Sequence, residues 1–255
     1  MRANPILEKL SRNQPCRGIW LGLPGAASAR LLARLALDWL LIDTEHAPID
    51  RHTLAHMVAA IAEAGGPAPV VRVAQASAEN IKQALDAGAY GVLAPMINTR
   101  QEAEQVVAWA KFPPEGQRSF GSAYAGLAFG VSMGEYLRQA NAHTLAMIQI
   151  ESQAALGNLD EIFSTPGLDL AFVGPVDLSI SLGLEPLPEN PHPRFQEAIQ
   201  EVIRAGQAHN LPLGIYCSNG PAAAERIRQG FRFVNVASDI GAMLRGVQAE
   251  LEASQ

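Results

Sequence analysis

The chain has 255 residues, of which 48% are hydrophobic and 17% charged, which is enough apolar material for a well-buried core and is not typical of a disordered protein. Its 19 basic and 25 acidic residues give a net charge of −6, and no Lys/Arg cluster indicates binding to nucleic acid or to a membrane. The two cysteines, Cys16 and Cys217, lie far apart without paired spacing, so neither a disulfide framework nor a zinc knuckle is expected. We also expect neither a signal peptide nor a membrane span. Together these features predict a cytoplasmic protein.

Eight short apolar segments recur along the chain and are predicted to be β-strands. Most of them are apolar throughout rather than alternating, as expected for parallel strands covered on both faces. They span residues 18–23, 39–43, 69–73, 91–97, 145–150, 170–174, 213–217 and 233–237.

The segments between these strands carry helical patterns. Residues 77–88 begin with a Ser that suits an N-cap and end at a Gly, and three other segments have apolar residues at three- and four-residue spacing. These three are residues 99–111, 194–209 and 221–229. Residues 5–10 are expected to form a short leading helix, and residues 240–252 a helix after the last strand.

Eight strand–helix units in about 250 residues predict a (β/α)8 TIM barrel, forming a single domain over residues 1–255 with an additional C-terminal helix. A doubly wound open sheet is the alternative, because periodicity does not reveal whether a sheet closes. One interval is unusually long, and residues 113–133 within it are predicted to form a loop that serves a site or an interface, or is a plain surface excursion.

Acidic side chains follow two consecutive strands at their carboxyl ends, where barrel enzymes place their chemistry. Glu151 and Asp177 are 26 residues apart, which is one strand–helix repeat, so they are expected to lie side by side. Two such carboxylates repel each other unless a cation lies between them, and oxygen ligands suit a hard divalent ion such as Mg²⁺ or Mn²⁺. The alternative is that each carboxylate caps a helix or pairs with an arginine. With Gln149 two residues before Glu151, the pair favours a metal site.

His46 and Arg72 follow or end another adjacent pair of strands. Histidine titrates near neutral pH and is the usual general base, and Asp43 is placed to orient or polarise its imidazole. Arginine keeps its charge and can stabilise a carboxylate or a developing enolate. The alternatives are a structural histidine and an ion pair between Arg72 and Glu45. Lys9, Lys82 and Lys111 all lie in helical patterns, so a Schiff-base lysine inside the barrel is not expected and carbonyl chemistry would need a metal.

At these residues the chain resembles the class II, metal-dependent pyruvate aldolases of the 4-hydroxy-2-oxoheptanedioate aldolase type, within the citrate-lyase-like/phosphoenolpyruvate-binding barrel superfamily. The resemblance runs in order along the chain and is specific in combination. It is carried by residues 37–47 (LDWLLIDTEHA), 70–73 (VVRV), 81–88 (IKQALDAG), 113–121 (PPEGQRSFG), 149–152 (QIES) and 173–179 (VGPVDLS).

The resemblance implies a role for each candidate residue. His46 is the proton acceptor, Arg72 stabilises the enolate, and Glu151 and Asp177 hold a divalent cation, which is Mg²⁺, Mn²⁺ or Co²⁺. The substrate contacts are Gln149, Trp20, Arg118, Arg72 and the backbone at Val176 and Asp177.

Asp86 matches an Asp that raises the basicity of the histidine in this family. It closes the helix before residues 91–97, at the opposite end of its own barrel, so it would have to act on another subunit or be a solvated helix-end carboxylate. The family also implies a homohexamer, built as a trimer of dimers whose C-terminal helices are exchanged.

The resemblance predicts a divalent-metal-dependent aldolase that forms or cleaves 4-hydroxy-2-oxo acids through the enolate of pyruvate or hydroxypyruvate and an aldehyde. Oxaloacetate decarboxylation is the expected side activity, because it passes through the same enolate. Two alternatives stay open at this stage: a CoA-ester lyase of the citrate-lyase-β type, and a non-catalytic barrel that binds a keto acid.

Overall fold

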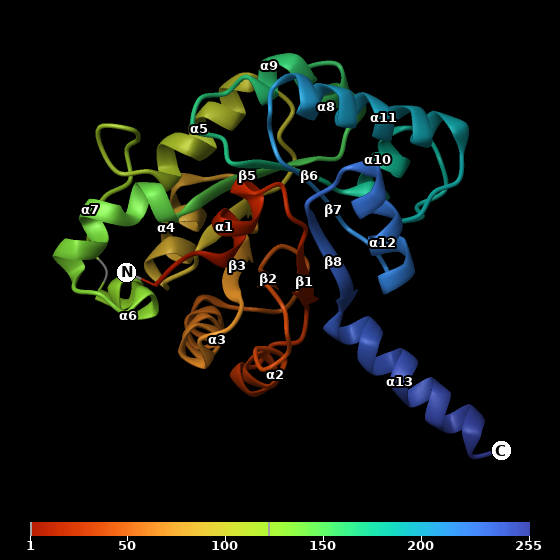
Figure 1. Cartoon of the computed structure of the whole chain (residues 1–255), viewed down its shortest axis with the longest axis horizontal. Coiled ribbons are helices and arrows are strands. Elements are labelled where there is room, and N and C mark those ends of the chain that lie inside the picture. The colour runs from red at the N-terminus through yellow and green to blue at the C-terminus, as the bar shows by residue number, and fades with distance from the viewer. Residues whose placement is uncertain (1, 122) are drawn as a thin grey trace.

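Eight parallel strands close into a barrel in chain order, and β1 pairs with both β2 and β8 (Figure 1). This computed structural model describes residues 2–121 and 123–255. The strands are β1 (Cys16–Leu21), β2 (Trp39–Asp43), β3 (Ala68–Arg72), β4 (Gly91–Ala94), β5 (Leu145–Ile150), β6 (Leu170–Val173), β7 (Leu213–Ile215) and β8 (Phe233–Ser238). The closed order confirms the predicted barrel and excludes the open sheet.

The helices surround the strands and mostly begin at side-chain caps. Asp50 accepts a hydrogen bond from the Thr53 N–H at the start of α3, and Thr99 and Glu102 form a reciprocal capping box at the start of α5. Within the described part of the chain, no helix has the length and apolarity needed to cross a membrane. The helices are α1 (Pro5–Ser11), α2 (Ala26–Leu32), α3 (Arg51–Ala64), α4 (Ala78–Asp86), α5 (Arg100–Ala110), α6 (Ala123–Phe129), α7 (Met133–His143), α8 (Gln153–Leu156), α9 (Leu159–Phe163), α10 (Pro175–Ser181), α11 (Pro193–Ala208), α12 (Gly220–Gln229) and α13 (Asp239–Ala253).

Residues 113–133, in the long segment between β4 and β5, are not the loop that the sequence predicted, because they contain α6. The prediction over residues 113–133 also covers Ser122, which lies outside the described residues. Phe129 of α6 is buried and stacks on Tyr90 with 3.9 Å between ring centroids, and the Tyr90 hydroxyl donates to the carbonyl of Ala128. This buried aromatic packing stabilises α6, and the helix propensity of its sequence alone did not indicate it. Tyr90 directly precedes β4, so α6 packs near the N-terminal end of the barrel.

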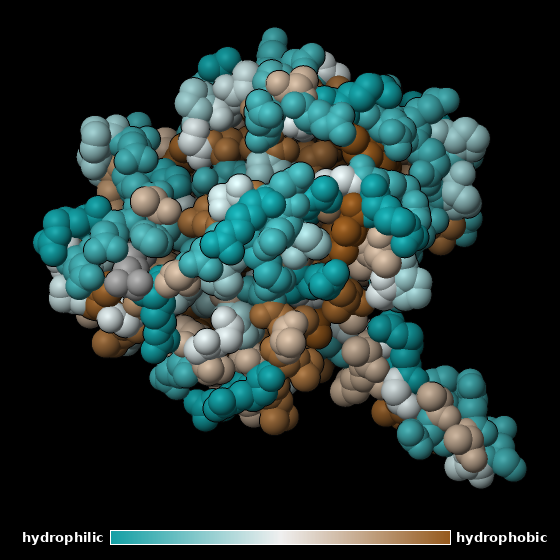
Figure 2. All heavy atoms as spheres, in the orientation of Figure 1, coloured by the Kyte–Doolittle hydropathy of each residue, from teal (hydrophilic) through white to brown (hydrophobic). Residues whose placement is uncertain are grey.

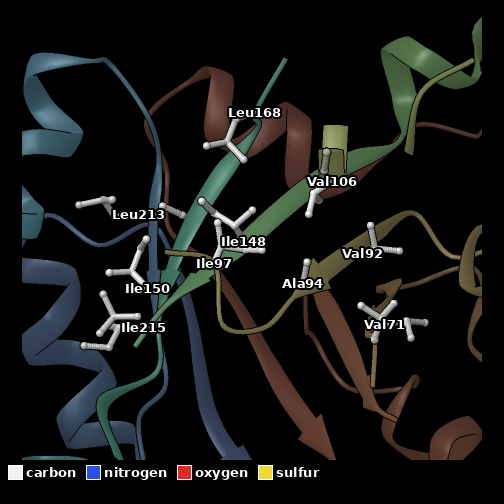
Figure 3. Close-up of a cluster of buried hydrophobic side chains, with 14 of the residues drawn as sticks. Val71, Val92, Ala94, Ile97, Val106, Ile148, Ile150, Leu168, Leu213 and Ile215 are labelled. Carbon is white, nitrogen blue, oxygen red and sulfur yellow. The ribbon is translucent and has the colours of Figure 1, made fainter. Parts of the chain in front are cut away.

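The core has two layers because successive strand residues face opposite sides of the sheet. One layer lies between strands and helices; Figure 3 shows part of it, with Val92 and Ala94 of β4 and Ile148 and Ile150 of β5. The other fills the barrel and includes Trp39, which stacks on Phe233 at 4.1 Å between centroids. A Cβ at Gly18 would overlap the Trp39 ring, so this glycine makes room for the indole.

The last helix, α13, extends away from the barrel instead of lying against it (Figure 1). Its exposed apolar side chains are Ile240, Met243, Leu244, Val247 and Leu251. Figure 2 shows apolar residues on the surface of this projecting helix. The predicted C-terminal helix is therefore confirmed, and its exchange between subunits stays a prediction.

Candidate active site

Three of the candidate residues, Asp43, Arg72 and Gln149, lie near the carboxyl ends of their strands and line the inside of the barrel there. On β2 the inward-facing positions run from Trp39 and Leu41 to Asp43, and on β5 they run from Met147 to Gln149. Along each strand the inward positions are thus apolar at the bottom and polar at the carboxyl end. Strand periodicity of two therefore brings the polar groups together at one end of the barrel, where active sites of this fold lie.

A pocket of about 390 Å³ opens at this end. Of the sequence-predicted site residues, it brings together Trp20, Asp43, His46, Arg72, Gln149, Val176 and Asp177. Among the described residues that line it, Arg72 is the sole Lys or Arg. A Schiff-base lysine is therefore missing from this lining, in line with the positions of Lys9, Lys82 and Lys111 in or at the ends of helices.

Arg72 is fixed by two carboxylates and an indole. Arg72 and Asp43 are register partners on β3 and β2, and the guanidinium donates from Nε to Oδ1 at 3.0 Å and from Nη2 to Oδ2 at 2.6 Å. Its Nη1 lies 3.0 Å from Glu45 Oε2, so the ion pair considered as the structural alternative is present as well. The guanidinium carbon also lies 4.8 Å from the centroid of the Trp20 ring. These contacts hold a rigid cation in the pocket wall.

Asp43 serves Arg72 and the backbone near His46. Burial alone would raise the pKa of Asp43, but the hydrogen bonds and charge of Arg72 outweigh burial, and the pKa of this carboxyl is lowered. Asp43 Oδ1 accepts from the backbone N–H of His46 at 3.3 Å, so Asp43 positions the residue through its main chain. The imidazole is largely exposed, and its Nε2 lies 3.9 Å from Glu45 Oε1.

Glu151 is a buried carboxylate with one donor on each oxygen. Oε1 accepts from the backbone N–H of Met96 and Oε2 from Gln149 Nε2, both at 2.7 Å. Burial is the main reason that the pKa of Glu151 is raised to about 7, and the negative charge of Asp177 raises it further against the Met96 hydrogen bond. Burial and the charge of Asp177 thus disfavour the ionised form of Glu151, and a nearby positive charge would stabilise it.

Asp177 lies in the first turn of α10, beside Val176. The N-cap residue Gly174 gives no side-chain cap, so the first N–H groups of α10 are available to an anion such as a substrate carboxylate. A Cβ at Gly174 would overlap Glu151 Oε2, so this glycine allows the backbone to approach the carboxylate closely.

These residues fit a divalent cation. Gln149 Oε1 is buried and has no hydrogen-bond partner among the described residues, and the donor set of carboxylate and amide oxygens suits Mg²⁺ or Mn²⁺. No group of three or more His, Cys, Asp or Glu side chains that could hold a metal occurs in the described residues. Glu151 and Asp177 would therefore leave coordination positions open for substrate and water.

The stability of the metal-free protein should depend on this carboxyl. The pKa of Glu151 is about 7 in the folded protein against 4.5 for an ordinary glutamate, so the folded state binds the proton more tightly. The free energy of unfolding should therefore fall as pH rises from about 5 to about 8, by at most about 3 kcal/mol. Urea unfolding in EDTA should show this fall, and Glu151→Gln should flatten it. An unchanged pH profile in Glu151→Gln, with Glu161→Gln on α9 as the control, would contradict the assignment.

Asp86 and Arg118 lie elsewhere. Asp86 ends α4 at the end of the barrel opposite the pocket, and Arg118 Nη2 donates to its Oδ1 at 2.9 Å. Arg118 is buried, donates to the Tyr136 hydroxyl at 2.9 Å, and lies over the Phe112 ring. The structure therefore brings these two predicted residues to each other and not to the pocket of their own chain.

Several pocket residues were missed by the sequence reasoning. Phe172 of β6 and Tyr216 after β7 pack on Trp20, each with 5.6 Å between ring centroids. Asp239, at the start of α13, accepts from the backbone N–H groups of Gly22 and Leu23 and so fixes the β1 loop. Tyr216 and Asp239 directly follow strands and Phe172 lies one residue before the end of β6, so a search for aromatic as well as ionisable residues near strand ends would have found them.

Comparison with known proteins supports the resemblance seen in the sequence. The family model described as HpcH/HpaI aldolase/citrate lyase matches residues 17–245. The hydroxypyruvate/pyruvate aldolase of Rhizorhabdus wittichii is 39% identical over 250 residues, covering 98% of each chain. The 4-hydroxy-2-oxo-heptane-1,7-dioate aldolase of Salmonella paratyphi C is 39% identical over 246 residues, covering 96% of this chain and 92% of that one.

A solved structure gives the same answer for the fold. The crystal structure of an HpcH/HpaI aldolase/citrate lyase family protein from Burkholderia cenocepacia superposes with a TM-score of 0.91 at 35% identity, covering 99% of both chains. The matched region contains the barrel and every pocket residue described above. The chain therefore belongs to the HpcH/HpaI aldolase/citrate lyase family, which is metal-dependent.

Proposed function

We propose that the protein is a divalent-metal-dependent aldolase, a carbon–carbon lyase that forms and cleaves 4-hydroxy-2-oxo acids through the enolate of pyruvate or hydroxypyruvate. The observation that carries the proposal is the buried Glu151 carboxylate, which lies near enough to Asp177 and Arg72 for their charges to shift its pKa and is hydrogen-bonded to Gln149, while Gln149, Asp177, Arg72 and His46 line one pocket. Such an arrangement concentrates negative charge where a 2-keto acid, itself an anion, must also bind. A bound divalent cation would offset the repulsion between the carboxylates and the substrate.

Glu151 and Asp177 would hold the ion, with Mg²⁺, Mn²⁺ and Co²⁺ as candidates. When bound, the ion supplies Lewis acidity that polarises the keto group and makes the neighbouring carbon acidic. The uncapped N–H groups at the start of α10 bind the substrate carboxylate. The side-chain amide of Gln149, whose Oε1 has no hydrogen-bond partner among the described residues, contacts the keto acid. Arg72, held rigid by Asp43 and Glu45, stabilises the enolate oxygen.

His46 is the general base of the proposal. Its imidazole is exposed and lines the pocket, and the hydrogen bond from the His46 backbone N–H to Asp43 fixes the position of the main chain that carries it. In the synthetic direction His46 moves the C3 proton, and in cleavage it takes the proton of the C4 hydroxyl so that the C3–C4 bond breaks and an aldehyde leaves. Trp20, Phe172 and Tyr216 provide an apolar wall that excludes water from the enolate.

A pyruvate-release assay tests the function. The protein should produce pyruvate and an aldehyde from a 4-hydroxy-2-oxo acid, and EDTA should abolish the reaction until Mg²⁺ or Mn²⁺ is added back. Oxaloacetate should be decarboxylated under the same metal dependence. Full activity after removal of the metal would overturn the proposal. Acyl-CoA esters should not react, since the described pocket lining holds no Lys or Arg besides the paired Arg72 for the CoA phosphates.

We also propose that the active form is a homohexamer that exchanges α13. Each barrel strand is normally covered by the helix that follows it, but α13 leaves β8 and exposes an apolar stripe. On the neighbouring α2, Leu31 is 74% exposed, so an incoming α13 from another subunit would find an apolar surface there. Asp86 and Arg118 would reach an active site only across such an interface. Sedimentation equilibrium should give six chains, and a monomer would contradict the exchange.

A further inference from the structure

The turn between β4 and α5 contains a strained residue that touches the proposed metal ligand. Met96 has a φ of 57°, a left-handed conformation that a residue with a side chain adopts at a cost. Its side chain is 52% exposed, so burial of the thioether does not explain the conformation. Its backbone N–H, however, donates to Glu151 Oε1 at 2.7 Å. The strained backbone thus directs a main-chain donor at the carboxylate.

Asn98 holds this turn with all four of its polar groups. Its side-chain Nδ2 donates to the Met96 carbonyl at 3.0 Å. Its backbone N–H donates to Glu102 Oε2 at 2.7 Å, within the capping arrangement of α5. Its carbonyl accepts from Asn158 Nδ2 at 2.8 Å, and its Oδ1 accepts from the Ser152 hydroxyl. The Met96 peptide is therefore tied to α5 on one side and to the segment that follows Glu151 on the other.

The two donors on Glu151 leave its remaining lone pairs in a defined direction. Gln149 Nε2 occupies Oε2 and the Met96 N–H occupies Oε1, each at 2.7 Å. Without the Met96 donor, the carboxylate would keep a bond on one oxygen only and could rotate about its last torsion. Hydrogen bonds of this kind fix the orientation of metal ligands and tune their affinity.

We propose that Asn98 is a positioning residue for the metal ligand: it locks Met96 in the left-handed conformation, and the Met96 N–H in turn orients the Glu151 carboxylate for the cation. This inference rests on the proposed function, because it needs Glu151 to be a ligand. Asn98 acts through Met96 and does not line the pocket.

Mn²⁺ titration followed by electron paramagnetic resonance tests this role without relying on turnover. Asn98→Ala should raise the dissociation constant for Mn²⁺ by about 10- to 100-fold, as expected for loss of an outer-shell partner. The kcat at saturating Mn²⁺ should fall much less than the affinity does. Ser152→Ala, which removes the donor to Asn98 Oδ1, should shift the dissociation constant in the same direction and serves if Asn98→Ala does not fold.

Asn80→Ala is the matched control, since the Asn80 Nδ2 likewise donates to a backbone carbonyl, that of Gln75, in the turn after the neighbouring strand β3. It should leave the dissociation constant unchanged. Folded Asn98→Ala that binds Mn²⁺ as tightly as the unsubstituted protein would overturn the positioning role, as would an equal loss in Asn80→Ala. If the unsubstituted protein itself binds no Mn²⁺ that depends on Asp177, the proposed function fails instead.

Discussion

Asp177→Ala is expected to lose Mn²⁺ affinity and aldolase turnover together. The substitution removes one of the two carboxylates that would hold the cation. The other two carboxylates in the described pocket lining are engaged elsewhere, because Asp43 pairs with Arg72 and Asp239 accepts from backbone N–H groups of the loop after β1. Because the ion contributes several kcal/mol to stabilising the enolate, kcat/KM should fall by at least about 10³-fold. Metal titration and pyruvate release measured on the same preparation give the two results.

Asp160→Ala is the matched control for this experiment. Asp160 is an exposed residue on α9 whose Oδ1 lies 3.1 Å from His209 Nε2, and it does not line the pocket. It should leave both metal affinity and turnover unchanged. Unaltered metal titration in Asp177→Ala would remove Asp177 from the ligand set.

His46→Ala is expected to keep the metal and lose turnover. Removal of a general base costs about 10²- to 10⁴-fold in kcat. The imidazole is not one of the proposed ligands, and its side chain is 65% exposed, so the substitution leaves the core intact. The dissociation constant for Mn²⁺ should therefore stay the same while kcat for cleavage of a 4-hydroxy-2-oxo acid falls. Steady-state kinetics at saturating Mn²⁺ measures the loss.

His52→Ala controls for the loss of a histidine near the same part of the chain. His52 lies on the exposed face of α3, where its Nε2 contacts the Nε2 of His56 at 3.2 Å. It should be as active as the unsubstituted protein. A His46→Ala variant with undiminished kcat would exclude His46 as the base.

The sequence was most informative about the strands. All eight predicted segments overlap observed strands, because a barrel strand is covered on both faces and is therefore a short continuous apolar run in the sequence. The cluster at the pocket was also predictable, since Asp43 and Arg72 end apolar runs, Gln149 lies one residue before the end of another, and the fold brings such ends together. Strand order and the two-residue period were enough for that step.

What the sequence did not reveal depends on side-chain geometry between distant residues. Asp43 was expected at the His46 imidazole, but a side chain three residues away contacts the backbone more easily than the ring. Asn98 carries no chemistry of its own, and its four hydrogen bonds join segments up to 60 residues apart. Helix α6 is stabilised by the stacking of Phe129 on Tyr90, and the local sequence of α6 does not indicate this contact with a distant residue.

Diffraction from crystals grown with Mn²⁺ and oxalate, an analogue of the pyruvate enolate, tests the central claim most directly. An anomalous peak should lie in contact with the carboxylates of Glu151 and Asp177, with oxalate beside Arg72 and the first turn of α10. A manganese peak at any other site, in protein that is active with Mn²⁺, would contradict the account.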